Sequence, residues 1–161
     1  MSKIFRQGAV GALLDEYERA ISDLKKVIEL IPDNSLTRII NTKTTDENCM
    51  SIQTILSHLV NSGYGYATYI NNLNRPALVR PRKTFHLTIK EYLQDLTNVF
   101  SFTENIFKEI KDSELEEPDN SLKIETTWGQ VYDIEQLTEH AIVHILRHRR
   151  QIEKIVWAFA K

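Results

Sequence analysis

The chain contains a single cysteine, Cys49, among its 161 residues. A lone cysteine excludes an intramolecular disulfide and is typical of proteins kept in a reducing compartment. No apolar run approaches the roughly 18 residues that a membrane-spanning helix requires. The first residues also lack the continuous apolar core and small-residue cleavage site of a secretory signal. These absences predict a soluble, cytoplasmic protein with no membrane partner.

Several functional classes are disfavoured by what the sequence does not contain. Its net charge of −2 and pI near 6.2 give no support for a nucleic-acid partner, which normally meets a basic face. There is no glycine-rich phosphate loop, no Gly-x-Ser-x-Gly elbow and no His-Glu-x-x-His motif. No glutamate precedes a histidine by three residues, so the Glu-x-x-His signature of di-iron bundles is missing too.

Apolar residues recur at three- and four-residue spacing in four segments, which predicts four amphipathic helices. A composition of 42% hydrophobic and 26% charged residues suits one globular domain covering residues 1–161. Pro32 is expected to end the first helix because proline cannot continue it. Capping boxes mark the start of the last two helices, where Glu91 follows Thr88 and Gln136 follows Asp133 by three residues. The predicted helices cover residues 8–31, 51–73, 88–110 and 133 to nearly the C-terminus.

The segments between these helices are long. Residues 35–50 are polar and predicted to be a connection, and residues 74–86 contain two prolines and three arginines. We expect the second segment to be a solvated loop crossing the end of the bundle. Residues 122–126 alternate apolar and polar, which favours a short hairpin around Trp128 and Gly129. The pattern as a whole predicts an all-α four-helix bundle with long crossover loops.

Three of the five histidines lie on the last predicted helix, at positions 140, 144 and 148. Residues four apart are neighbours on one helical face, so an adjacent pair can place two imidazoles on one metal ion. At about 100° per residue from Leu137, His148 falls near 20° and His144 near −20°, beside the apolar stripe. His140 falls near −60°, at the margin of that stripe. The inner pair is therefore His144 and His148, and Gln151, near −40°, could be a hydrogen-bond partner behind it.

A metal site needs at least one further protein ligand. His58 lies inside the second predicted helix, on a flank that can face a neighbouring helix, whereas His86 lies in a loop. We therefore choose His58. The alternative is that His58 is an ordinary hydrogen-bonded core histidine, and that the histidine pair on the last helix arose by chance.

Two segments resemble motifs of a known family. The segment 52–59, Ile-Gln-Thr-Ile-Leu-Ser-His-Leu, is similar to the second-helix motif of the DinB-like (DinB/YfiT) metalloproteins. The segment 140–152, with its His-x-x-x-His pair, resembles their last-helix motif. The resemblance implies a bundle, often a homodimer, in which His58, His144 and His148 hold a divalent ion such as zinc or nickel. One departure is Arg150, where many relatives have glycine, and we expect it to face outward.

Three functions follow as hypotheses. The first is a metal-dependent enzyme, of thiol S-transferase or hydrolase type, that acts on a small molecule such as a low-molecular-weight thiol. The second is a non-catalytic metal- or ligand-binding bundle with a stress-related role, and the third is a helical interaction protein without metal. No catalytic residue can be assigned, and Glu139 and Tyr69 are only nearby candidates for a general base.

Overall fold

The computed structural model describes residues 4–40 and 42–159, and most of these are helical. Its four helices are α1 (Gly8–Ile28), α2 (Ile52–Asn74), α3 (Ile89–Phe107) and α4 (Ile134–Phe159). Two short strands, β1 (Ile124–Glu125) and β2 (Val131–Tyr132), precede α4. Single turns of 3₁₀ helix interrupt the connections: η1 (Asp33–Ser35), η2 (Glu47–Cys49), η3 (Asp112–Glu114) and η4 (Asn120–Leu122). The predicted all-α four-helix bundle is confirmed. None of the described helices combines the length and apolar character needed to cross a membrane.

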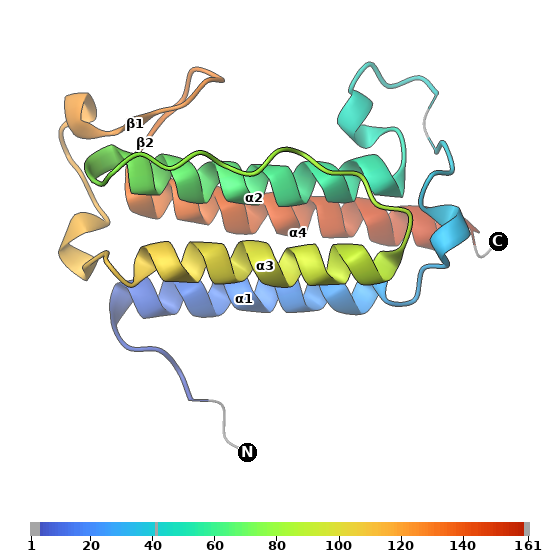
Figure 1. Ribbon diagram of the computed structural model, residues 1–161, viewed down its shortest axis with the longest axis horizontal. Helices are drawn as coiled ribbons and strands as arrows, with labels where there is room; N and C mark the ends of the chain where they lie inside the picture. Colours follow the sequence, from blue (N-terminus) through green and yellow to red (C-terminus); the bar gives the residue numbers. More distant parts are fainter. Residues whose placement is uncertain (1–3, 41, 160–161) are drawn as a thin grey trace.

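The helices pack in a ring in which α1 contacts α3 and α4, and α2 contacts the same two helices. In Figure 1, α1 and α4 run in one direction while α2 and α3 run in the other. Because α2 and α3 are parallel neighbours, the chain between them has to return along the whole length of the bundle. Residues 75–88, which we call the strap, make this return over α2 (Figure 1).

The prediction that this segment crosses the end of the bundle was wrong, because the strap follows the side of the bundle. Near its beginning, Leu78 N–H donates to Asn72 Oδ1 at 2.8 Å, and Asn72 Nδ2 donates back to the Leu78 carbonyl at 3.0 Å. Near its other end, Gln53 Nε2 donates to the His86 carbonyl at 2.8 Å. Asn72 and Gln53 lie at opposite ends of α2, so the strap is held along that helix.

The helix boundaries follow local chemistry. The first helix ends at Ile28, three residues before the predicted end. The pyrrolidine ring of Pro32 would clash with the carbonyl of residue 28 if the helix continued, so the chain leaves the helix earlier. The box before α4 is present, since Asp133 N–H donates to Gln136 Oε1 at 3.1 Å and Gln136 N–H to Asp133 Oδ1 at 2.8 Å.

The short hairpin expected before α4 is also present. Ile124 pairs with Tyr132 and Glu125 with Val131 in antiparallel register. Gly129, at the turn, has a φ of 82°, a left-handed conformation that favours glycine. The turn carries Trp128 back toward α2 and α4, which places an aromatic ring beside the helices.

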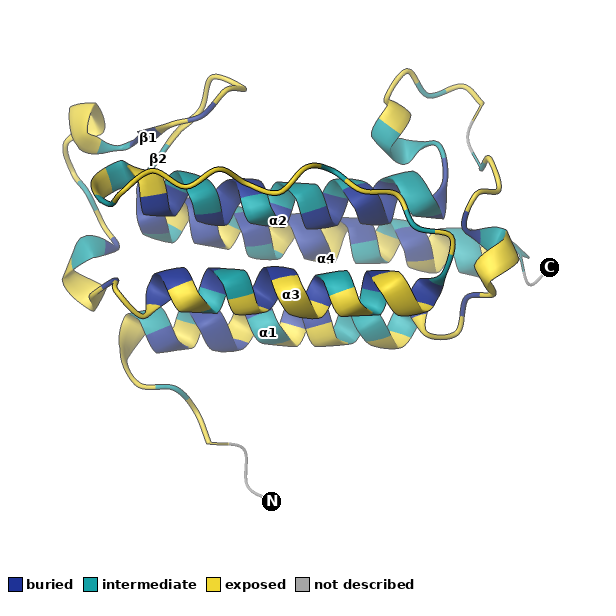
Figure 2. Ribbon diagram, viewed as in Figure 1, coloured by how far each residue is buried: buried dark blue, intermediate teal, exposed yellow. Residues whose placement is uncertain are grey.

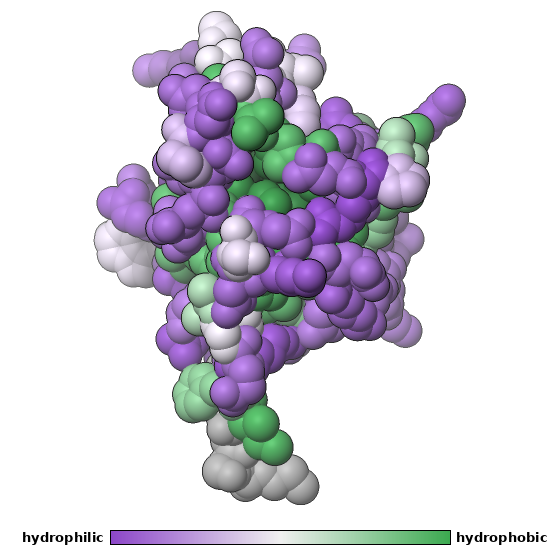
Figure 3. Space-filling view, turned by 90° about the vertical axis from the view of Figure 1, so that its left-hand side faces the viewer, coloured by the Kyte–Doolittle hydropathy of each residue, from purple (hydrophilic) through white to green (hydrophobic). Residues whose placement is uncertain are grey.

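The core lies between the helix faces that point inward, drawn dark blue in Figure 2. Fully burying one leucine or isoleucine side chain contributes roughly 1.5–3 kcal/mol, so the stripes of the four helices supply most of the driving force. Figure 3 faces the end of the bundle where α1 and α4 begin, and it shows hydrophobic residues surrounded by hydrophilic ones. Among the apolar residues of α4, His144 and His148 are buried too, with exposed fractions of 6% and 5%. Buried polar groups need partners, so these two histidines are candidates for a binding site.

Candidate metal centre

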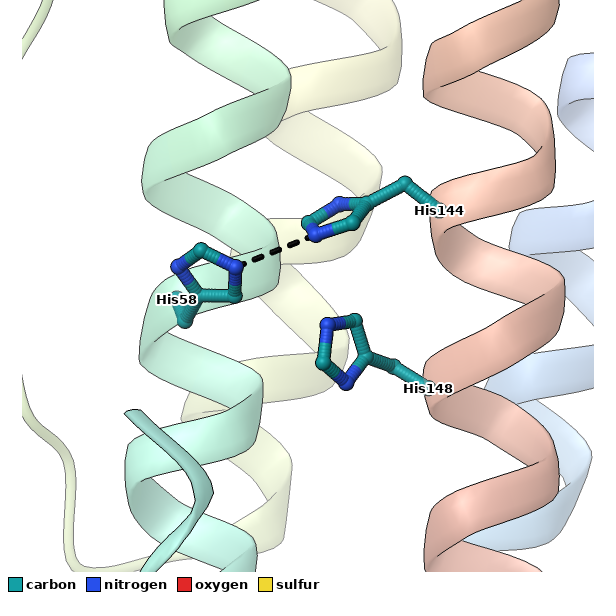
Figure 4. A group of neighbouring side chains, drawn as sticks. All are labelled: His58, His144 and His148. Atoms are coloured by element: carbon teal, nitrogen blue, oxygen red, sulfur yellow. Dashed lines mark hydrogen bonds between the residues drawn. The ribbon is translucent and has the colours of Figure 1, made fainter. Parts of the chain in front are cut away.

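Three histidines from two helices meet between α2 and α4. His144 and His148 are one turn apart on α4 and face α2, which contributes His58 (Figure 4). One ring nitrogen of each histidine lies within 4.8 Å of the corresponding nitrogen of the other two. The pair His58 Nε2 and His144 Nε2 is 3.0 Å apart and joined by a hydrogen bond, dashed in Figure 4. The three predicted ligands are therefore brought together in one group.

The spacing of these nitrogens suits a single ion. Zinc–nitrogen bonds of about 2.0–2.1 Å in a tetrahedral site put two ligand nitrogens about 3.3 Å apart. The 3.0 Å separation between His58 and His144 is only slightly shorter, so a small side-chain rotation would open it. His148 Nε2 is buried and has no hydrogen-bond partner. A buried polar atom left unpaired is costly, and a bound ion would give this nitrogen the partner it lacks.

The electrostatics of the group also suit a cation. Burial, followed by the neighbouring His148, lowers the pKa of His144 to about 3 and that of His58 to about 4. Burial likewise lowers the pKa of His148. All three imidazoles are therefore neutral at pH 7, and the neutral form is the one whose lone pair binds metal.

The imidazoles are oriented by partners on their outer side. Gln151 Oε1 lies 2.9 Å from His148 Nδ1, and because this oxygen only accepts, His148 Nδ1 has to donate. The lone pair of His148 is then on Nε2, the atom that faces the other two histidines. Ser62 Oγ lies 3.5 Å from His58 Nδ1 in a longer contact of the same kind. The predicted role of Gln151 behind the histidine pair agrees with this geometry.

A cavity of about 690 Å³ opens beside the histidines, within the size range of small-molecule sites. His58 and His144 line it, while the aromatic rings of Tyr66, Tyr69 and Trp128 form another part of its wall. The Trp128 ring packs edge-on against Tyr66 and Tyr69, at centroid distances of 6.1 and 5.9 Å. The hairpin therefore supplies a wall of the cavity that helix periodicity could not reveal.

Two arginines of the cavity were missed by sequence reasoning. Arg80 belongs to the strap, whose arginines were expected to be solvated, and Arg147 projects from α4. Arg147 is exposed on α4, and it lies at the rim of the cavity. The strap's path along α2 brings Arg80 to this cavity, and no local sequence signal reports that path.

The other two histidines, His140 and His86, lie outside the three-histidine group. His140 lines the cavity, its ring stacked 6.2 Å from that of His144. His86 lies on the strap, where its Nε2 is 2.6 Å from Asp95 Oδ2. Arg150 is exposed, as expected. Among the described residues, the three predicted ligands form the only group of this kind.

The two candidates for a general base also differ. Tyr69 lines the cavity, and its hydroxyl accepts from Thr127 N–H at 3.0 Å and donates to Thr127 Oγ1 at 3.2 Å. Glu139 is exposed on α4 and does not line the cavity. The Tyr69 hydroxyl is thus engaged in holding the hairpin.

The fold and the site together define a class, the four-helix bundles with a cluster of three histidines between two helices. The chain belongs to the DinB family, whose sequence profile matches residues 2–156. This confirms the resemblance drawn from the two histidine segments. A search among curated proteins returns no match to the chain.

Proposed function

We propose that the protein is a metal-dependent enzyme in which His58, His144 and His148 hold one divalent ion, zinc or nickel. The observation that carries the proposal is a cluster of three neutral imidazoles, two of which, His58 and His144, line a cavity of about 690 Å³. Three neutral ligands leave the charge of a divalent ion uncompensated. When bound, such an ion would supply Lewis-acid chemistry and lower the pKa of a coordinated water or thiol toward neutrality.

The reaction class we propose is thiol S-transfer or hydrolysis on a small molecule held in the cavity. His58 and His144 face the cavity, whereas His148 is buried behind them and is held by Gln151. The aromatic wall carrying Tyr66 and Trp128 would exclude water from one side of a bound substrate. These residues bind, orient and shield, while the cavity leaves room for a substrate beside the histidines.

The runner-up is a non-catalytic metal- or ligand-binding bundle with a stress-related role. One observation favours it: none of the described residues that line the cavity is an aspartate or glutamate. The cavity therefore lacks the carboxylate that often acts as general base in hydrolysis. Thiol transfer needs no such group once the thiol is deprotonated, so we rank that reaction above hydrolysis. The homodimer and the cytoplasmic location remain predictions.

Elemental analysis of the purified protein tests the metal site. We expect about one divalent ion per chain, lost in His144→Ala and retained in the control His86→Ala, whose histidine lies on the strap. Thiol consumption with a panel of electrophiles, together with a panel of esters and amides, then tests the reaction. Stoichiometric metal without turnover of any substrate would favour the non-catalytic bundle. Metal retained in His144→Ala would contradict the site itself.

A further inference from the structure

The charged groups of the cavity are of one sign. Arg80 and Arg147 line it, and no acidic residue of the described chain does. The other lining groups are uncharged polar, aromatic or aliphatic, together with the histidines, whose pKa values are lowered by burial. A concave site with low-dielectric walls and charges of one sign attracts ligands of the opposite sign. The cavity is therefore electrostatically suited to an anion.

Arg80 is placed at the cavity by contacts of the strap. The two hydrogen bonds between Asn72 and Leu78 hold the strap against α2 two residues before Arg80. Its guanidinium then lies over Gly65 of α2, where an added Cβ would be only 2.7 Å from Arg80 Nη1. Glycine inside a helix is destabilising relative to alanine, and here its missing side chain leaves room for the guanidinium. Arg80 thus rests on the helix surface at the cavity wall.

Arg147 reaches the same cavity from α4. It lines the cavity together with His58 and His144, so its positive charge lies at the same cavity as the histidine cluster. Arg147 also precedes the buried His148 on α4, so the helix fixes the position of its backbone relative to the cluster. The two arginines therefore approach the cavity from different elements.

Neither arginine is neutralised by a carboxylate in the part of the chain that the structure describes. Two other arginines are neutralised by carboxylates. Arg75 pairs with Glu114 at 3.0 Å, and Arg149 pairs with Asp23 at 3.6 Å. The guanidinium groups at the cavity keep their hydrogen-bond donors for a ligand. Guanidinium donors match carboxylate and phosphate oxygens, often two at a time.

We propose that the cavity binds a small organic molecule whose anionic group, a carboxylate or an oxyanion of similar shape, is held by Arg80 and Arg147. The apolar part of this ligand packs against Tyr66 and Trp128, and its reactive end points to the histidine cluster. This inference rests on the proposed function, because the metal centre is what makes that end reactive. It narrows the substrate class from any small molecule to a small organic anion.

The test uses the full-length protein loaded with cobalt, whose absorption spectrum changes when a thiolate binds. Two probes of equal length, 3-mercaptopropionate and 3-mercaptopropanol, differ in the charge of the distal group. We expect the anionic thiol to bind about tenfold tighter or more, the effect of one charge-assisted hydrogen bond. Arg147→Gln and Arg80→Gln should each reduce this preference severalfold toward parity. Arg150→Gln and Arg82→Gln remove the same charge outside the cavity and should retain it.

Three results would overturn the anion site while leaving the metal site intact. The first is equal affinity of cobalt-loaded protein for the two thiols, and the second is the same loss of preference in Arg150→Gln as in Arg147→Gln. The third is the absence of a spectral change with the anionic thiol at millimolar concentration.

If the protein binds no cobalt, the metal proposal fails, and the anion site is judged separately. Calorimetric titration of the metal-free protein with 3-phenylpropionate and 3-phenylpropanol then has to show the same preference for the anion. That preference has to be reduced in Arg147→Gln, and equal heats for the two probes would overturn the proposal.

Discussion

Replacing Gln151 by alanine should weaken zinc binding without removing a ligand. Gln151 Oε1 accepts the hydrogen bond from His148 Nδ1 at 2.9 Å, which keeps the lone pair of His148 on Nε2. His148 Nε2 is buried without another partner, so the orientation of this ring depends on Gln151 more than on solvent. In Gln151→Ala the ring is free to turn, and its Nδ1–H loses its acceptor.

The expected size of the effect follows from these contacts. A neutral hydrogen bond contributes about 0.5–1.5 kcal/mol net, and loss of ring orientation adds to it. Removal of an outer partner of a metal-binding histidine typically lowers affinity by about 10–100-fold, or roughly 1.4–2.7 kcal/mol. We expect Gln151→Ala to fall in this range. Gln151→Glu keeps the acceptor and adds negative charge, so its affinity should equal or exceed that of the unchanged protein.

The assay is competition for zinc against a chromophoric chelator at pH 7 and fixed ionic strength. Gln94→Ala, an exposed glutamine on α3, is the matched control and should leave the affinity unchanged. Urea unfolding of the metal-free variants checks that they remain folded. Affinity of Gln151→Ala within twofold of the unchanged protein would refute the role of this hydrogen bond. Weaker binding by Gln151→Glu than by Gln151→Ala would show that the His148 tautomer is the opposite one.

Two further predictions concern stability. Because the pKa values of His144 and His58 are lowered to about 3 and about 4, the unfolded chain takes up protons first as the pH falls below about 6.5. The free energy of unfolding of the metal-free protein should therefore decrease as the pH falls from about 6.5 to about 4, and it should decrease less steeply in His144→Gln. Urea titrations at several pH values measure this dependence. The same dependence on pH in His144→Gln as in the unchanged protein would contradict the prediction. In Gly63→Ala, the added Cβ would lie 2.8 Å from Val99 Cγ2 and 3.4 Å from the Tyr17 hydroxyl. Overpacking costs about 1–3 kcal/mol and the better helix propensity of alanine returns about 0.5–1 kcal/mol. We therefore expect the free energy of unfolding in urea to fall by up to about 2.5 kcal/mol, and a stabilised variant would contradict this.

Local patterns were sufficient for the helices and for two of the three histidines in the cluster. Periodicity identified all four helices, and the Asp133–Gln136 box marked the start of α4. His144 and His148 share a buried face because a helix brings every fourth residue to one side. The end of α1 was placed three residues late, because the clash of Pro32 acts one turn before the proline itself.

His58 required information from beyond its own helix. Its place inside a helix favoured His58 over His86, but nothing in its local sequence distinguishes a metal ligand from a hydrogen-bonded core histidine. The family resemblance supplied the independent support for His58 as a ligand. The packing of α2 against α4 then brings His58 Nε2 to 3.0 Å from His144 Nε2. This distance depends on the relative position of two helices, which helical periodicity within either one cannot supply.

The sequence alone thus determined the bundle class, through the periodicity of four segments. It also determined the buried histidine pair on α4 and the role of Gln151, since both depend on contacts within one turn of helix. Only the tertiary structure decided the path of the strap, the wall formed by Trp128 and the arrival of Arg80 at the cavity. The path of the strap and the position of Arg80 exist because α2 and α3 are parallel and the connecting chain has to run back along α2. The Trp128 wall exists because the hairpin between α3 and α4 packs its ring against Tyr66 and Tyr69 of α2. A contact between distant segments depends on the packing of the whole bundle, so the cavity and its charge are properties of the folded protein rather than of any one segment.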